Sequence, residues 1–152
     1  MSLKDRLTED MKEALKAKEA GKLRLSTIRM VRSAIKYQEI DKGHELGDEE
    51  VIQVLAREVK QRRDAVVEYE KANRPETVAS LHDEIAVLMA YLPQQMTEEE
   101  IITLVRKTAA ELDVKSPKEM GKVMGKIAPL TKGRADGKLV SEIVTKILNG
   151  EL

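Results

Sequence analysis

The residues most suggestive of a chemical site are glycines and lysines in one short stretch near the C-terminus. Residues 120–144 read MGKVMGKIAPLTKGRADGKLVSEIV and hold four of the chain's eight glycines. Gly121, Gly125 and Lys126 come close to the loop G-x-x-x-x-G-K-[ST], whose backbone amides and lysine hold nucleotide phosphates. However, three residues separate the glycines where four are needed, and Ile127 replaces the hydroxyl that would bind Mg²⁺. No strand pattern precedes the stretch, so the sequence argues against a nucleotide-binding loop.

The two glycines lie four residues apart in a segment that otherwise has a helical pattern. Each costs about 1 kcal/mol relative to alanine in a helix interior, so a compensating role is expected. Glycine at i and i+4 removes two side chains from one face, and a helix of the same protein, a partner helix or an RNA backbone can then approach closely. We expect that Gly121 and Gly125 mainly let helices of this protein touch, and that the lysines beside them face a partner.

Positive charge is segregated along the chain although the formal net charge is zero. The segment 20–38 has five basic residues and no acid, and 115–138 has seven basic residues against two acids. Such a distribution can present a phosphate-binding face, while the alternative is ordinary solvated helix faces. The third predicted helix adds Arg57, Lys60, Arg62 and Arg63 to this charge. Aromatic residues are only 2% of the chain, so any RNA recognition should read shape and backbone and not stack on bases.

Catalytic and metal-binding groupings are not apparent. His44 and His82 are the only histidines, and there is no cysteine. No local spacing indicates a nucleophile beside a base. We therefore expect no catalytic residue, no metal site and no cofactor.

Apolar residues recur at helical spacing along the whole chain, and no strand pattern competes, so we predict an all-α fold. In the first part, four longer helices are expected. The first is capped by Ser2 and ends near Gly21, the second spans about 22–41, the third is capped by Asp48, and the fourth begins at Pro75.

Three shorter helices are expected after these four. Thr97 and Glu100 form a capping box for a helix over about 98–112. A second box at Ser116 begins a helix that Pro129 stops, and Asp136 caps the last helix. We therefore predict an N-terminal helical domain over 1–93 and a C-terminal three-helix domain over 97–152.

The N-terminus, MSLKDRLTEDMKEAL, has no apolar signal-peptide core, and no apolar run reaches the ~18 residues that a membrane helix needs. The sequence therefore predicts a cytoplasmic protein without a membrane partner.

Four segments carry a resemblance to a known family: LSTIRMVRSAIK, LAREVKQRRDAVVEYEKANR, AYLPQQMTEEEI and MGKVMGKIAPLTKGRADGKLV. Over residues 1–149 the chain resembles the bacterial YqeY-like proteins. Its last third also resembles the C-terminal tail domain of GatB, a subunit of the glutamine-dependent aspartyl/glutamyl-tRNA amidotransferase. The resemblance implies a helical N-terminal domain followed by a small three-helix domain.

The tail resemblance implies a role in holding tRNA. The family label of carbon–nitrogen ligase with glutamine as amide donor would come with it, but the catalytic domains of the amidotransferase have no counterpart here. The expected function is therefore a non-catalytic tRNA- or RNA-binding accessory protein. The exposed amides of the 131–137 loop are expected to add an anion site. With Gly125 from the glycine strip, the expected RNA- or partner-binding residues are Gly121, Lys122, Gly125, Lys126, Lys132, Gly133, Arg134 and Lys138.

Two alternatives remain open. One is a protein-interaction adaptor that receives a partner's helix on the glycines and on Met120 and Met124, because methionine side chains adapt to varied surfaces. The other, less favoured, is a component of a carbon–nitrogen ligase.

Overall fold

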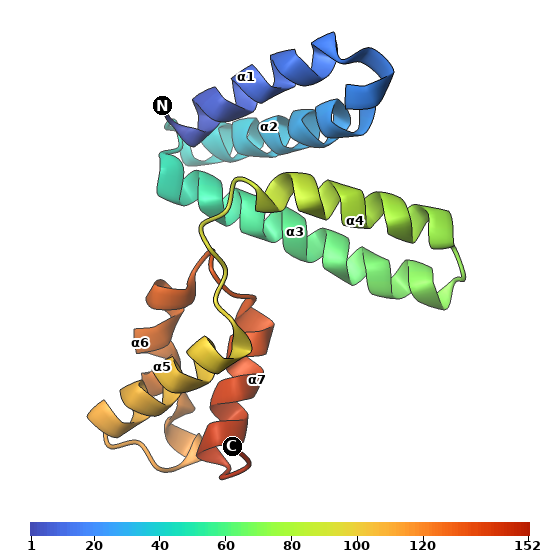
Figure 1. Ribbon diagram of the computed structural model, residues 1–152. Helices are drawn as coiled ribbons and strands as arrows, with labels where there is room; N and C mark the ends of the chain where they lie inside the picture. The colour runs from blue at the N-terminus through green and yellow to red at the C-terminus, as the bar shows by residue number, and fades with distance from the viewer. The chain divides into compact units, whose positions relative to one another are not determined.

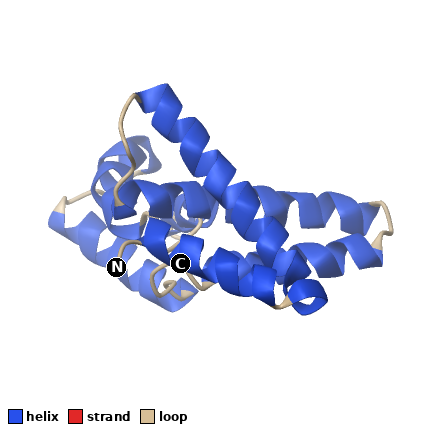
Figure 2. Cartoon of the chain, turned by 90° about the horizontal axis from the view of Figure 1, so that it is seen from above, coloured by secondary structure: helices blue, strands red, loops and turns tan.

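The computed structural model describes all 152 residues, and the all-α prediction is confirmed: helices and loops account for the chain, with no strand (Figures 1 and 2). The chain divides into two compact units, Met1–Leu92 and Pro93–Leu152. Each unit has a hydrophobic core of its own, made entirely of aliphatic residues except for Tyr91.

The first unit consists of two helical hairpins (Figure 1). In the first, α1 packs against α2 after a short 3₁₀ turn. In the second, α3 packs against α4, and α2 contacts both of these helices. The bounds are α1 Leu3–Lys16, the 3₁₀ turn Lys18–Gly21, α2 Lys22–Lys42, α3 Asp48–Lys71 and α4 Pro75–Met89.

The beginnings of α1 and α3 are joined by a hydrogen bond. Ser2 caps α1 as predicted, its hydroxyl accepting from the amide of Asp5 at 3.1 Å. The prediction that Asp48 caps α3 is wrong, because Gly47 holds the cap position and Asp48 is the first helical residue. The Asp48 carboxylate instead accepts from the Leu3 amide at 3.0 Å, so it satisfies a free N–H group of α1.

Gly21 allows the 3₁₀ turn to lie directly on α1. A Cβ atom at this position would be 2.1 Å from the carbonyl oxygen of Ala14, far inside van der Waals contact. Ala14 is itself buried. Glycine is therefore required here by a close approach of two backbones.

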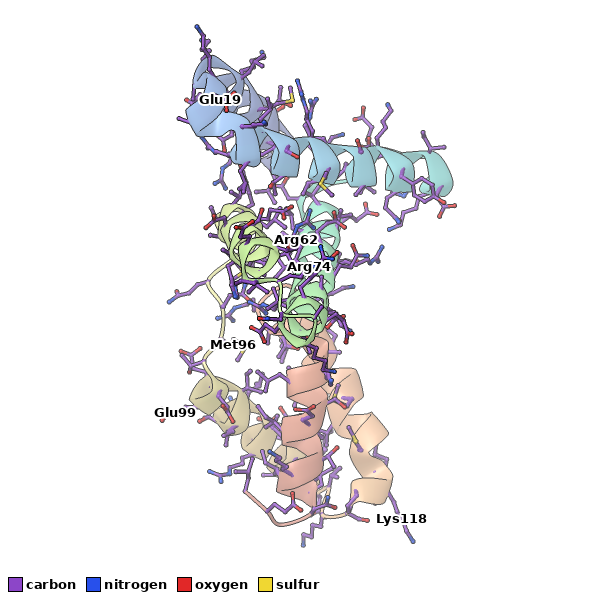
Figure 3. The ribbon with its side chains drawn as sticks, turned by 90° about the vertical axis from the view of Figure 1, so that its right-hand side faces the viewer. Glu19, Arg62, Arg74, Met96, Glu99 and Lys118 are labelled. Atoms are coloured by element: carbon purple, nitrogen blue, oxygen red, sulfur yellow. The ribbon has the colours of Figure 1, made fainter.

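Arg62 of α3 is buried inside the first unit, and its side chain reaches Glu84 of α4 (Figure 3). Its side chain is only 7% exposed and is 3.4 Å from the carboxylates of both Glu58 and Glu84. It also donates to the Glu58 carbonyl at 3.1 Å. The prediction that Arg62 contributes to a basic surface is therefore wrong, because its guanidinium is buried and paired with the carboxylates of Glu58 and Glu84.

Tyr91 closes the first unit against α1. Its ring is buried, its hydroxyl donates to the Asp10 carboxylate, and the Arg6 guanidinium lies 5.1 Å from the ring centroid. Burial, and after it the hydrogen bond to the Asp10 carboxylate, raises the pKa of Tyr91 to about 12. The ring packs at the end of the helical core and is not available to stack on a base.

The second unit is a three-helix unit around Ile101, Val105, Val123, Ile127 and Val144. Thr97 caps its first helix by accepting from the Glu100 amide at 3.1 Å, and Asp136 caps the last by accepting from the Lys138 amide at 3.2 Å. The bounds are α5 Glu98–Glu111, a 3₁₀ turn Pro117–Glu119, α6 Met120–Thr131 and α7 Gly137–Leu148.

The prediction that Pro129 stops the sixth helix is wrong, because α6 continues to Thr131 with Pro129 inside it. A proline in this position removes one hydrogen bond and crowds the carbonyl four residues earlier, here that of Gly125. A glycine at that point tolerates the local distortion. The Thr131 hydroxyl then donates to the Ile127 carbonyl at 3.2 Å and closes the last turn.

Candidate nucleic-acid interface

One side of α6 carries almost no side-chain bulk. Gly121, Gly125, Ala128 and Pro129 are all exposed, and we refer to these four residues as the α6 outer face. A Cβ atom added at either glycine would meet no atom within 4 Å. The expectation that these glycines let helices of this protein touch is therefore wrong.

Helical geometry explains why the glycines face outward. Val123 and Ile127 are buried against α5 and α7, and each is two residues from a glycine. Two residues correspond to a rotation of about 200°, so the glycines lie opposite the buried stripe. Met120 and Met124 pack against the unit's own core, and they do not join the glycines in one surface as the adaptor hypothesis requires.

Lysines border the α6 outer face. Lys122 and Lys126 follow the two glycines and are 3.6 Å from Glu119 and 3.5 Å from Glu111. Both pairs are well exposed, so each stabilises the fold by roughly 0–1 kcal/mol and gives way to a stronger anion at little cost.

Two further lysines lie beyond the ends of the helix. Lys118 precedes α6 and extends away from the helices (Figure 3), and Lys132 follows the last turn. Neither has a carboxylate within 4.0 Å, and the same is true of exposed Lys138 on α7.

Gly133 and Arg134 serve the fold of the second unit. Gly133 is buried with φ 76°, a conformation that favours glycine, and its carbonyl accepts from the Gln95 side chain at 2.8 Å. The Arg134 side chain donates to the Gln94 carbonyl at 3.1 Å, and its own carbonyl accepts from the Met96 amide at 2.8 Å. These bonds fasten the segment before α5 to the turn after α6.

The predicted anion site on the amides of the 131–137 loop is partly occupied by acceptors of the protein itself. The amides of Arg134 and Ala135 both donate to the Thr131 carbonyl at 2.9 Å, and that of Lys138 donates to Asp136. Of the predicted binding residues, the structure brings together Gly121, Lys122, Gly125 and Lys126, with Lys132 beyond the helix end.

The two histidines of the sequence belong to the first unit, and the α6 outer face belongs to the second. His44 and His82 are exposed residues of the first unit, and His44 Nδ1 lies 2.9 Å from the Glu45 carbonyl. The structure contains no cluster of three or more histidine, aspartate or glutamate side chains suited to a metal ion. None of the helices has the length and apolar character needed to cross a bilayer.

Two helical units, one with a side-chain-poor helix face bordered by lysines, define an all-α protein with a surface suited to close contact. A family model described as "Yqey-like protein" matches residues 4–148. The chain belongs to the YqeY-like family.

Two fungal relatives support the same assignment. The chain is 35% identical over 126 residues to "Altered inheritance of mitochondria protein 41, mitochondrial" of Kluyveromyces lactis, covering 80% of this chain and 66% of that protein. It is 34% identical over 114 residues to the protein of the same name from Lachancea thermotolerans, covering 73% and 60%. The chain thus matches less than two thirds of each relative. Their names place those proteins in mitochondria, whereas a cytoplasmic location for this chain stays a prediction.

Proposed function

We propose that the protein is a non-catalytic accessory protein that binds the sugar–phosphate backbone of structured RNA, with tRNA as the first candidate, through the α6 outer face. The observation that carries the proposal is the exposure of Gly121 and Gly125 with open space before them. Two helical glycines that no internal contact requires lower the stability of α6, and a closely approaching partner backbone accounts for them.

The charges beside this face favour RNA over a protein helix as the partner. Lys122 and Lys126 lie along one edge, and Lys132 lies beyond the C-terminal end of the helix. Lysine binds phosphate as a point charge and releases condensed counterions, so affinity should fall steeply with salt. The adaptor alternative is weakened because Met120 and Met124 are used by the core.

The test is a titration of labelled tRNA with the wild type and with Lys122→Ala/Lys126→Ala/Lys132→Ala at several salt concentrations. If each lysine contacts one phosphate, the slope of log K against log salt should fall by about 3 in the triple variant. Arg134 is left intact, because its replacement would loosen the segment before α5.

A matched control removes three exposed charges elsewhere in the same unit: Arg106→Ala/Lys107→Ala/Lys146→Ala. This control should bind tRNA nearly as tightly as the wild type. Equal losses in the two triple variants would show only nonspecific attraction to positive charge and would contradict the proposed site.

A second variant tests the flatness of the face independently of charge. Gly121→Leu places a bulky side chain in open space, so the protein should fold while RNA binding weakens. Unchanged affinity in this variant would show that no backbone approaches the glycines.

A further inference from the structure

A groove of about 630 Å³ runs between α1 and α2 in the first unit. One wall carries three cations from successive turns of α2, namely Arg29, Arg32 and Lys36, all of them exposed. The hydroxyl-bearing residues Thr8 of α1 and Ser33 of α2 also line the groove. This volume is within the range of ligand sites in proteins, roughly 300–1,000 Å³.

None of the three cations on this wall forms a close ion pair, although the charge of Lys36 contributes to lowering the pKa of Glu39. No carboxylate oxygen lies within 4.0 Å of any of them, and Arg32 contacts only the weakly accepting sulfur of Met11, at 2.9 Å. Toward the ends of the same helix, Arg24 is 3.4 Å from Asp10 and Lys42 is 2.9 Å from Glu50, while Lys22 at the first position has no carboxylate that close. Three of the four unpaired cations of α2 therefore line the groove.

The acid at one end of the groove is already engaged. Glu39 accepts from the Lys4 ammonium at 2.6 Å and from the Leu46 amide at 2.9 Å. These two bonds, in that order, lower the pKa of Glu39 below its usual range, and it stays ionised beside Lys4. The charges of Glu39 and Lys4 cancel. Glu45 is the other carboxylate that lines the groove, and the three cations of α2 outnumber it, so the groove has an excess of positive charge.

We propose that the α1–α2 groove binds a ligand bearing two or more phosphate groups in a row. Arg29 and Lys36 are separated by about two helical turns, or roughly 10 Å, which exceeds the size of one phosphate. Arginine offers paired N–H donors that match phosphate oxygens, and the Ser33 hydroxyl adds a neutral donor, whereas the Thr8 hydroxyl already donates to the Lys4 carbonyl at 3.0 Å. No aromatic residue lines the groove, so recognition is of the phosphates and not of a base.

This ligand chemistry has two sources, a small polyphosphate and a phosphodiester strand, and the experiment uses both. The full chain is titrated with inorganic triphosphate by calorimetry and, in parallel, with a labelled 12-nucleotide single-stranded RNA. The variant is Arg29→Ala/Arg32→Ala/Lys36→Ala, and exposed alanines favour the helix, so α2 should remain folded. The control, Arg57→Ala/Lys60→Ala/Arg63→Ala, removes the same charge from exposed positions of α3.

We expect the groove variant to bind at least one of the two probes at least tenfold more weakly than the control variant does. For the RNA, the salt slope should also fall by about 2, as expected for three contacts on a single strand. Loss of triphosphate binding alone identifies a small phosphorylated ligand, and loss of RNA binding alone identifies a strand. If the wild type binds neither probe, or the two variants lose affinity equally, the proposal is wrong. Neither result bears on the α6 outer face, whose lysines are unchanged in both variants.

Discussion

Gly21 and Gly121 differ in the space around them: the first is in tight contact with another backbone, and the second faces open space. At Gly21 the backbone of a 3₁₀ turn touches the carbonyl of Ala14, and no room is left for a side chain. At Gly121 there is only open space, and φ is not in the left-handed region. The first glycine therefore stabilises the fold and the second lowers its stability.

These relations predict opposite effects for the same substitution. Gly21→Ala should lower the free energy of unfolding of the first unit by about 1–3 kcal/mol, because the added methyl group forces the turn away from α1. Gly121→Ala should raise that of the second unit by about 1 kcal/mol, because alanine restricts the unfolded chain and favours the helix. Urea denaturation followed by circular dichroism measures both. A stability loss in Gly121→Ala would mean that the outer face of α6 is packed after all.

At the scale of elements, α1 is held by polar contacts from three directions. In its first turn the Leu3 amide donates to Asp48 and the Lys4 ammonium donates to Glu39. Farther along the helix, Asp10 accepts from the Tyr91 hydroxyl. These contacts depend on charge, so the attachment of α1 should depend on pH.

We expect Tyr91 to cause the loss of stability of the first unit at alkaline pH. Its pKa is about 12 in the fold against about 10 in an unfolded chain, so the unfolded state loses the proton first as pH rises. The stability contributed by Tyr91 is complete below pH 10 and is lost between about pH 10 and 12. Lys4, whose pKa Glu39 raises through their hydrogen bond, is also titrated in this region.

Tyr91→Phe isolates the contribution of the phenol. Stability measured from pH 8 to 11 should fall less steeply in this variant than in the wild type, while Lys4 acts equally in both. At neutral pH the variant should lose about 1–3 kcal/mol, because the Asp10 carboxylate loses a hydrogen-bond donor. Parallel pH profiles would contradict the assignment.

Helix positions were predictable because they follow from local spacing and capping, which neighbouring residues determine. The orientation of α6 was also implicit, since Val123 and Ile127 mark the buried stripe and the glycines fall opposite it. Arg62 had a similar signal, lying between Val59 and Val66 at helical spacing. The contacts of Arg134 with Gln94, and of α1 with the basic wall of α2, join segments far apart in sequence, and no local pattern specifies them.

At the scale of the whole molecule, stability is divided between two separate cores. The second unit spans only residues 93–152, and a unit of about 60 residues buries a smaller fraction of its surface than a larger domain does and is marginally stable. Exposed Gly121 and the proline inside α6 lower its stability further. We therefore expect two thermal transitions, with the second unit unfolding first.

Substitution and ligand should act on different transitions. Arg62→Ala leaves Glu58 and Glu84 without their buried partner, so it should destabilise the first unit by about 3–5 kcal/mol and move only the transition of that unit. If tRNA binds the α6 outer face, a concentration 100-fold above Kd should stabilise the second unit by about 2.7 kcal/mol. Calorimetry of the wild type and Arg62→Ala, each with and without tRNA, measures all four combinations. A single transition that shifts as one would contradict independent units, and a tRNA-induced shift confined to the first unit would place RNA binding there, because a ligand stabilises only the unit whose folded state it binds.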